Sequence, residues 1–106
     1  MAIDERAPED MDEAARLIAK YAPELGFAIA DNHNSYKRYA NMRDVCVGQK
    51  QAAMSLEEIA ARRANGDVST YYVCCSTLFP NVFTNSQPFE AERLGLYAIA
   101  YDYDGM

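Results

Sequence analysis

Two carboxylic acids stand side by side near the start of the chain, between a short apolar run and a helix that carries Pro8 near its beginning. Residues 1–4 have the apolar character of a strand, so Asp4 and Glu5 fall at its carboxyl end. A pair of carboxyl groups can divide acid and base work when their surroundings push their pKa values apart. Acidic residues before a helix also serve as partners of its dipole, so the pair alone supports either interpretation.

Four further polar residues stand where they can meet a ligand. Asn32 and His33 come directly after an apolar run and can hydrogen-bond hydroxyl groups, although a lone histidine in a loop is more often solvated or structural. Tyr72 offers an aromatic face or a hydroxyl group, with core packing as the alternative. Asn81 lies in the loop that follows, where a binding role and loop scaffolding are equally compatible with the sequence.

Composition and charge exclude several classes of function. The chain has 106 residues, of which 50% are hydrophobic and 25% charged, as in an ordinary globular domain. Its net charge of -6 and lack of a basic cluster argue against a nucleic acid partner. No apolar window approaches the roughly 18 residues of a membrane span, and the His, Cys and Asp residues lack the spacing of a metal site. We therefore expect no nucleic acid, membrane, metal or cofactor.

The three cysteines do not predict a disulfide framework. Their number is odd, and Cys74 and Cys75 are adjacent, which would strain a mutual bridge. Together with Cys46 they are expected to be small buried apolar residues. A thiol-based redox function around Cys74 and Cys75 ranks last among the hypotheses, because the pair is not a CxxC motif and lies in an apolar strand.

Alternating strands and helices must position these residues. Nearly continuous apolar runs predict parallel strands at residues 1–4, 26–31, 45–49 and 69–75. Helical patterns lie between them: one starts near Pro8, a short one covers residues 36–42, and one is capped by Ser55 and stopped by Gly66. The last helix begins at residues 86–88 and is expected to bury Leu94, Tyr97, Ala98 and Tyr101.

The order of elements predicts an α/β fold with about four βα units and, at residues 101–106, the entry to a fifth strand. This pace is typical of a (β/α)8 barrel, for which about 250 residues are usual. We therefore predict a partial, half TIM-type (β/α)8 barrel. A flavodoxin-like sheet is the rival fold, since it also alternates strands and helices.

The motifs of residues 69–106 are similar to those of one enzyme family. They comprise a tyrosine and paired cysteines on a strand, a PNxFT-like loop, a small-residue and proline entry to an acidic helix, and a DG strand; the residues are Tyr72, Cys74, Cys75, Pro80, Asn81, Phe83, Thr84, Ser86, Pro88, Glu90, Glu92, Asp104 and Gly105. This segment resembles the C-terminal catalytic barrel of glycoside hydrolase family 123 and the uncharacterised group that shares it. The opening MAIDERAPEDM resembles the family's strand ending in Asp-Glu, so the resemblance covers residues 1–106 as a single partial domain, the second half of the barrel, truncated at both ends.

The resemblance implies a β-N-acetylgalactosaminidase or β-N-acetylhexosaminidase activity with a substrate-assisted retaining mechanism, in which the 2-acetamido group of the sugar replaces a protein nucleophile. It implies that Glu5 is the general acid and base and that Asp4 orients the acetamido group. Adjacent strand residues point to opposite faces, so the two converge on one sugar only if the chain turns at Glu5. The implied partner is a glycan that contains N-acetylhexosamine. The candidate substrate ligands, chosen by their positions in the sequence, are Asn32, His33, Tyr72 and Asn81.

The chain also departs from the family pattern. Met106 takes the place of an aromatic residue, and the sequence contains no tryptophan, the strongest stacking surface for a sugar. We expect the isolated chain to be inactive or nearly so, with self-association through its open sheet edges. The alternative function is a non-catalytic carbohydrate-binding or scaffold domain that pairs with another chain.

No signal peptide is evident in the sequence. The cellular compartment is therefore not predicted, and a parent protein that is secreted or periplasmic is one alternative.

Overall fold

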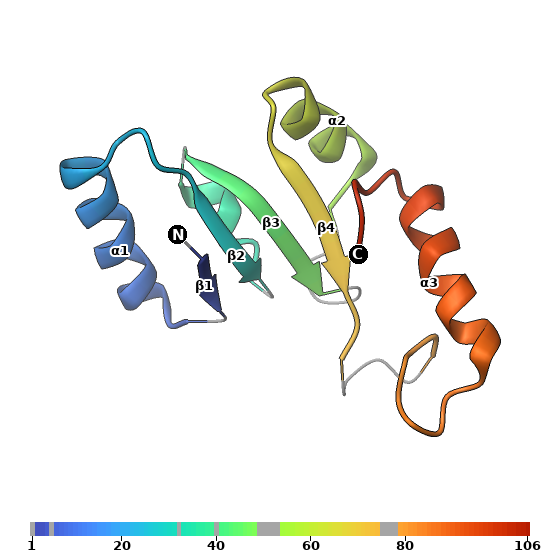
Figure 1. Ribbon diagram of the computed structural model, residues 1–106. Coiled ribbons are helices and arrows are strands. Elements are labelled where there is room, and N and C mark those ends of the chain that lie inside the picture. Colours follow the sequence, from blue (N-terminus) through green and yellow to red (C-terminus); the bar gives the residue numbers. More distant parts are fainter. Residues whose placement is uncertain (1, 5, 32, 40, 49–53, 75–78) are drawn as a thin grey trace.

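The computed structural model describes residues 2–4, 6–31, 33–39, 41–48, 54–74 and 79–106. Strands and helices alternate along the chain, as Figure 1 shows. The elements are β1 (Ala2–Asp4), α1 (Pro8–Tyr21), β2 (Phe27–Asp31), the 3-10 helix η1 (Ser35–Arg38), β3 (Met42–Gly48), α2 (Leu56–Ala64), β4 (Val68–Tyr72) and α3 (Pro88–Ala100).

The sheet has the strand order of a barrel wall. All neighbouring strands are parallel, and their order in space, β1-β2-β3-β4, is their order in the sequence. A flavodoxin-like sheet would instead place its second strand at the edge and its first strand inside. The predicted entry to a fifth strand is confirmed, since Gly105 forms a parallel bridge with Thr70 on the free edge of β4. The fold is therefore a partial TIM-type barrel with an open sheet.

The two faces of the sheet carry different side chains. Phe27, Ile29, Val45, Val47 and Tyr71 lie on one face and join the buried core with side chains of the helices, which include Met11, Ile18, Ile59 and Leu94. The alternate positions, which lie on the opposite face, hold smaller, half-buried residues: Ala28, Ala30, Cys46 and Thr70. In a closed barrel the face without helices is the one that lines the interior.

Helix ends form where the sequence predicts them. Pro8 occupies the first turn of α1, where its missing N–H costs nothing. Ser55 and Glu58 form the expected capping box of α2: the Glu58 N–H donates to Ser55 Oγ at 3.2 Å, and the Ser55 N–H donates to Glu58 Oε2 at 2.9 Å. Gly66, with φ of 81°, turns the chain in the left-handed conformation that stops the helix.

Several predicted boundaries are wrong. The short helix predicted at residues 36–42 is found as the 3-10 helix η1, but it ends at Arg38, and Met42 already begins β3, because the sheet register draws the chain into extended geometry earlier than the apolar run suggests. Strand β4 ends at Tyr72, so Cys74 lies beyond it and is exposed, while Cys75 is outside the described residues. Tyr101 is 48% exposed rather than buried, because it follows the last residue of α3 and stacks on Tyr97.

The amino end of β4 is held by ion pairs. Arg63 Nε lies 2.8 Å from Asp104 Oδ1, and another guanidinium nitrogen of Arg63 lies 2.8 Å from Asp102 Oδ2. Asp104 Oδ2 also accepts the Ser69 N–H at 2.7 Å. Burial alone would raise the pKa of Asp104, but the hydrogen bonds from Ser69 and Arg63 outweigh it and hold that pKa below its usual value. The Asp-Gly motif thus fixes the segment after α3 to β4.

Candidate functional site

The carboxyl ends of the four parallel strands meet at one edge of the sheet, which we call the rim (Figure 1). The backbone of Asp4 ends β1 there and pairs with Ala30, which in turn is in register with Cys46. The side chain of Asp4 and the whole of Glu5 lie outside the described residues, so the convergence of the two carboxyl groups stays a prediction. The backbone does place Asp4 at the end of the sheet where barrel enzymes hold their active sites.

The second rim position belongs to the segment after β2. His33 is exposed, and its backbone N–H donates to Asp31 Oδ1 at 2.7 Å. Asp31 ends β2 with only 2% of its surface exposed, and its Oδ2 accepts the Tyr36 N–H at 3.2 Å. Asn32 lies outside the described residues. Sequence reasoning missed Asp31, although an acid that ends an apolar strand just before a polar turn is a recognisable signal for such a bond.

Tyr72 ends β4 at the same rim. Its backbone is in register with Gly48 of β3, and the residue is half-buried. The neighbouring Tyr71 lies in the helix-covered core with none of its surface exposed, so Tyr72 occupies the opposite face, the one that Ala30 and Thr70 share. This location is compatible with the predicted ligand role, which stays a prediction.

Asn81 is buried within the loop after β4. It is 2% exposed, and its backbone N–H donates to Glu90 Oε2 at 3.0 Å. Its side-chain amide donates to the Cys74 carbonyl at 2.8 Å, and its Oδ1 accepts the Val82 N–H at 2.7 Å. Glu90 also accepts the Gln87 N–H at the start of α3. These contacts are those of loop scaffolding, and the ligand role of Asn81 stays a prediction.

The Cys46 thiol is poorly suited to redox chemistry. Burial raises the pKa of the Cys46 thiol and outweighs its hydrogen bond with Thr70, so that thiol is protonated near neutral pH.

Within the described ranges, no three His, Cys, Asp or Glu residues gather as they would around a metal ion. No helix in the same part of the chain is long and apolar enough to cross a membrane.

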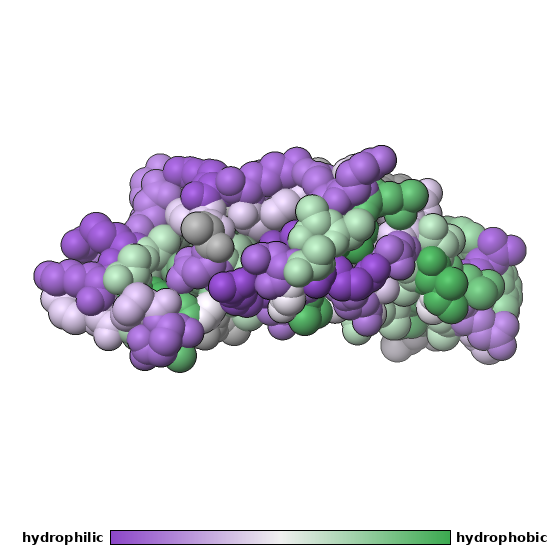
Figure 2. Space-filling view, turned by 90° about the horizontal axis from the view of Figure 1, so that it is seen from above, coloured by the Kyte–Doolittle hydropathy of each residue, from purple (hydrophilic) through white to green (hydrophobic). Residues whose placement is uncertain are grey.

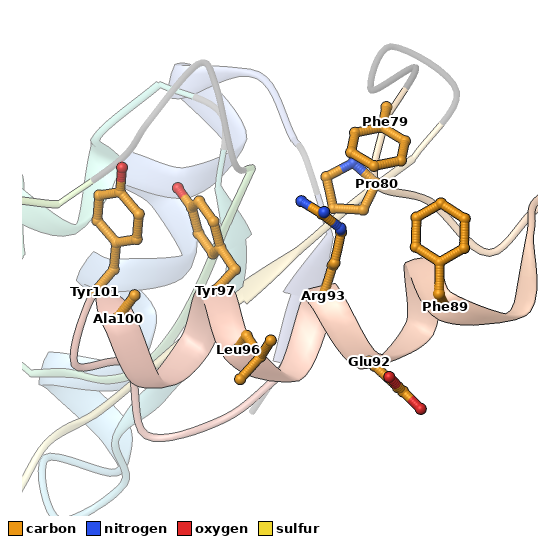
Figure 3. Close-up of a pocket in the computed structure, with 9 residues that line it drawn as sticks. All are labelled: Phe79, Pro80, Phe89, Glu92, Arg93, Leu96, Tyr97, Ala100 and Tyr101. Atoms are coloured by element: carbon orange, nitrogen blue, oxygen red, sulfur yellow. The ribbon is translucent and has the colours of Figure 1, made fainter.

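A groove of about 590 Å³ runs along α3. Figure 3 shows Arg93 projecting to the same side as Phe89 and Tyr97, while Glu92 points away. The Arg93 guanidinium lies 5.5 Å from the ring centre of Phe79 and 5.7 Å from that of Phe89. Figure 2 shows hydrophobic residues gathered at the end of the molecule that α3 forms, where Leu96 is 62% exposed. Of the candidate site residues that the structure describes, His33, Tyr72 and Asn81 do not line this groove, which is therefore a separate surface from them.

Comparisons with known proteins agree on the kind of domain. The family model described as glycoside hydrolase 123, catalytic domain, matches residues 1–106. A solved structure of a family 123 glycoside hydrolase from Clostridium perfringens, described in terms of glycolipid glycan hydrolysis, matches with a TM-score of 0.83 and 20% identity. That match covers 99% of this chain and 19% of the other. None of the curated proteins matches the chain.

Proposed function

This chain belongs to the family of glycoside hydrolase 123 catalytic domains, whose model matches residues 1–106, and on that premise we propose that the protein carrying it hydrolyses terminal β-linked N-acetylhexosamine, with N-acetylgalactosamine as the first substrate to test. The observation that carries the proposal is the position of Asp4. It ends β1 at the rim of a sheet with barrel strand order, next in sequence to Glu5.

The proposed mechanism assigns different protonation states to the two acids. Glu5, protonated, donates its proton to the glycosidic oxygen as the bond to the leaving group breaks, and the acetamido carbonyl oxygen of the same sugar attacks the anomeric carbon. Asp4, ionised, accepts the acetamido N–H and stabilises the positive charge of the oxazolinium intermediate. Water then attacks the anomeric carbon as its bond to the acetamido oxygen breaks, and the water gives a proton to ionised Glu5, which restores the acid and retains the configuration.

The other rim residues have supporting roles in this proposal. Asn32 and His33, after β2, hydrogen-bond hydroxyl groups of the sugar, and Tyr72 contributes its ring or its hydroxyl group from the end of β4. Asn81 contributes from the loop after β4. Because Asn81 makes its contacts inside that loop, its contribution is to hold the loop in shape.

The domain organisation is also part of the proposal. Residues 1–106 are the second half of a barrel, and the chain spans 19% of the length of its solved structural neighbour. The active site of a barrel is built from loops of all its strands. We therefore expect little or no turnover from residues 1–106 alone and activity only when the rest of the barrel is present.

The experiment is hydrolysis of an aryl N-acetyl-β-galactosaminide by the protein that contains these residues within a complete barrel. Glu5→Gln should lower kcat by about 10²-fold or more, because general acid catalysis contributes 10² to 10⁴. Glu9→Gln is the matched control, since Glu9 is an exposed acid of the first turn of α1. Undiminished turnover in Glu5→Gln would remove Glu5 from the mechanism.

A second candidate function is a non-catalytic carbohydrate-binding or scaffold domain that pairs with a second copy of the chain. The exposed apolar face of α3 favours it, with Leu96 at 62% and Ile99 at 77% exposure. A dimer of the purified chain in a sizing column that becomes a monomer in Leu96→Glu would support this function. A monomeric chain that gives no heat of binding with N-acetylgalactosamine would contradict it.

A further inference from the structure

A buried carboxylate at the rim has no role in the mechanism proposed above. Asp31 is 2% exposed, yet its two oxygens accept hydrogen bonds from two different backbone amides, His33 N–H at 2.7 Å and Tyr36 N–H at 3.2 Å. Hydrogen bonds to an ionised acceptor are roughly twice as strong as neutral ones. The carboxylate therefore fixes both ends of the segment between His33 and Tyr36.

The segment it holds is a tight turn. Asn34 has φ of 56°, a left-handed conformation that a non-glycine residue adopts at a cost. The two amides bound to Asp31 flank this residue on either side, so the chain folds over the carboxylate as it enters η1. The His33 amide is held by this carboxylate alone among the described residues, so the turn would relax without it.

The turn is also connected to helix α2. The Tyr36 hydroxyl donates to Glu58 Oε1 at 3.4 Å, and Lys37 Nζ lies 2.6 Å from the same oxygen. Glu58 belongs to the capping box at the start of α2. Asp31 is thus the first member of a chain of contacts from the end of β2 to the first turn of α2.

We propose that Asp31 is a positioning residue for substrate binding: its carboxylate holds the turn that presents His33 to the sugar. This inference rests on the proposed function. Asp31 does not touch the substrate, since its side chain belongs to the helix-covered side and is enclosed by the turn. It acts through His33, and its loss weakens binding while the acid and base chemistry at Asp4 and Glu5 continues.

The test uses the protein with a complete barrel and an aryl N-acetyl-β-galactosaminide. Asp31→Asn keeps the size of the side chain but leaves one acceptor oxygen where two amides need one each. We expect KM to rise on the order of tenfold, the equivalent of about one hydrogen bond, with kcat within about twofold. Glu24→Gln, which removes an exposed carboxylate in the loop before β2, should leave both constants unchanged.

A double-mutant cycle separates positioning from general loosening of the fold. If Asp31 acts through His33, adding Asp31→Asn to His33→Ala changes KM little further, because the shared contact is already lost. Additive effects, or a fall in kcat with KM unchanged, would overturn the inference. Should Asp31→Asn fail to fold, Asn34→Val displaces the same turn without removing the carboxylate, because a β-branched residue resists positive φ, and the same rise in KM is expected.

The outcomes distinguish this inference from the function on which it rests. Turnover in the unsubstituted protein together with an unchanged KM in both Asp31→Asn and Asn34→Val overturns the positioning role and leaves the proposed function standing. Absence of turnover in the unsubstituted complete barrel contradicts the proposed function, and the positioning role falls with it.

Discussion

At the scale of single residues, Asn81 shows how a polar side chain near the rim serves the fold. Its amide and backbone groups bind the Cys74 carbonyl, the Val82 N–H and Glu90, all inside the loop after β4. Asn81→Ala would remove the hydrogen bonds of its side chain to the Cys74 carbonyl and the Val82 N–H, both of which are partly buried. Chemical denaturation should show a loss of about 2 kcal/mol in the free energy of unfolding.

Asn85→Ala is the control for that substitution. Asn85 lies in the same loop and is exposed, so its removal should change the unfolding free energy by no more than about 0.5 kcal/mol. Equal losses in the two variants would contradict the scaffolding role of Asn81.

Asp104 predicts a pH dependence of stability. Its pKa is lower in the folded chain than in the unfolded one, so its contribution is fully present above the unfolded pKa, about 4, and is lost as the pH falls through the folded pKa. Asp104→Asn should be less stable than the unsubstituted chain at pH 7, by on the order of 1 kcal/mol. Urea unfolding at pH 7 and pH 3 checks this.

The difference in unfolding free energy between the unsubstituted chain and Asp104→Asn should become smaller at pH 3, because a protonated aspartic acid resembles asparagine. An Asp44→Asn variant serves as the reference, since Asp44 is an exposed acid of β3. A difference that is the same at both pH values would show that Asp104 does not act through its charge.

At the scale of elements, the capping box of α2 makes a separate prediction. Ser55→Ala removes the acceptor of the Glu58 N–H, which lies 3.2 Å from Ser55 Oγ. The expected loss is about 1 kcal/mol of unfolding free energy. Glu57→Gln, an exposed change in the same turn, should cost less than half of that. Thermal unfolding in which the two variants coincide would contradict the role of the cap.

The sequence predicted the elements with strong local signals better than their boundaries. Ser55, Gly66 and Pro8 mark helix ends through their own conformational preferences, and the structure confirms all three. The start of β3 at Met42 depends on pairing with β2, which no local pattern encodes. The same holds for Tyr101, whose exposure follows from where α3 ends.

At the scale of the whole molecule, the sheet is open and elongated rather than closed. The principal extents of the molecule are 47 × 28 × 17 Å. Among the described strands, β1 pairs with β2 alone. Strand β3 has a partner on both sides, and its Val45 and Val47 have no exposed surface. We predict that amide hydrogens of β3 exchange slowest and those of β1 fastest. Equal protection of β1 and β3 by NMR would show that the edge of β1 is covered.

The candidate site could be predicted only in part. The strand pattern placed Asp4 at a strand end, which the structure confirms for its backbone, but it placed Tyr72 inside a strand that in fact ends at this residue. The sequence could not show that Asn81 turns into its own loop, or that Asp31 holds the turn before Tyr36, because both facts depend on tertiary hydrogen bonds.

The most direct test of the account compares two leaving groups in Glu5→Gln of the complete barrel. A general acid matters for a poor leaving group and little for one that departs without a proton, such as 2,4-dinitrophenolate. We predict a loss in kcat of about 10²-fold or more on a natural N-acetylgalactosaminide, with near-normal release of 2,4-dinitrophenolate in the first step. An equal loss on both substrates, or none on either, would contradict the assignment of Glu5 as the acid at the rim.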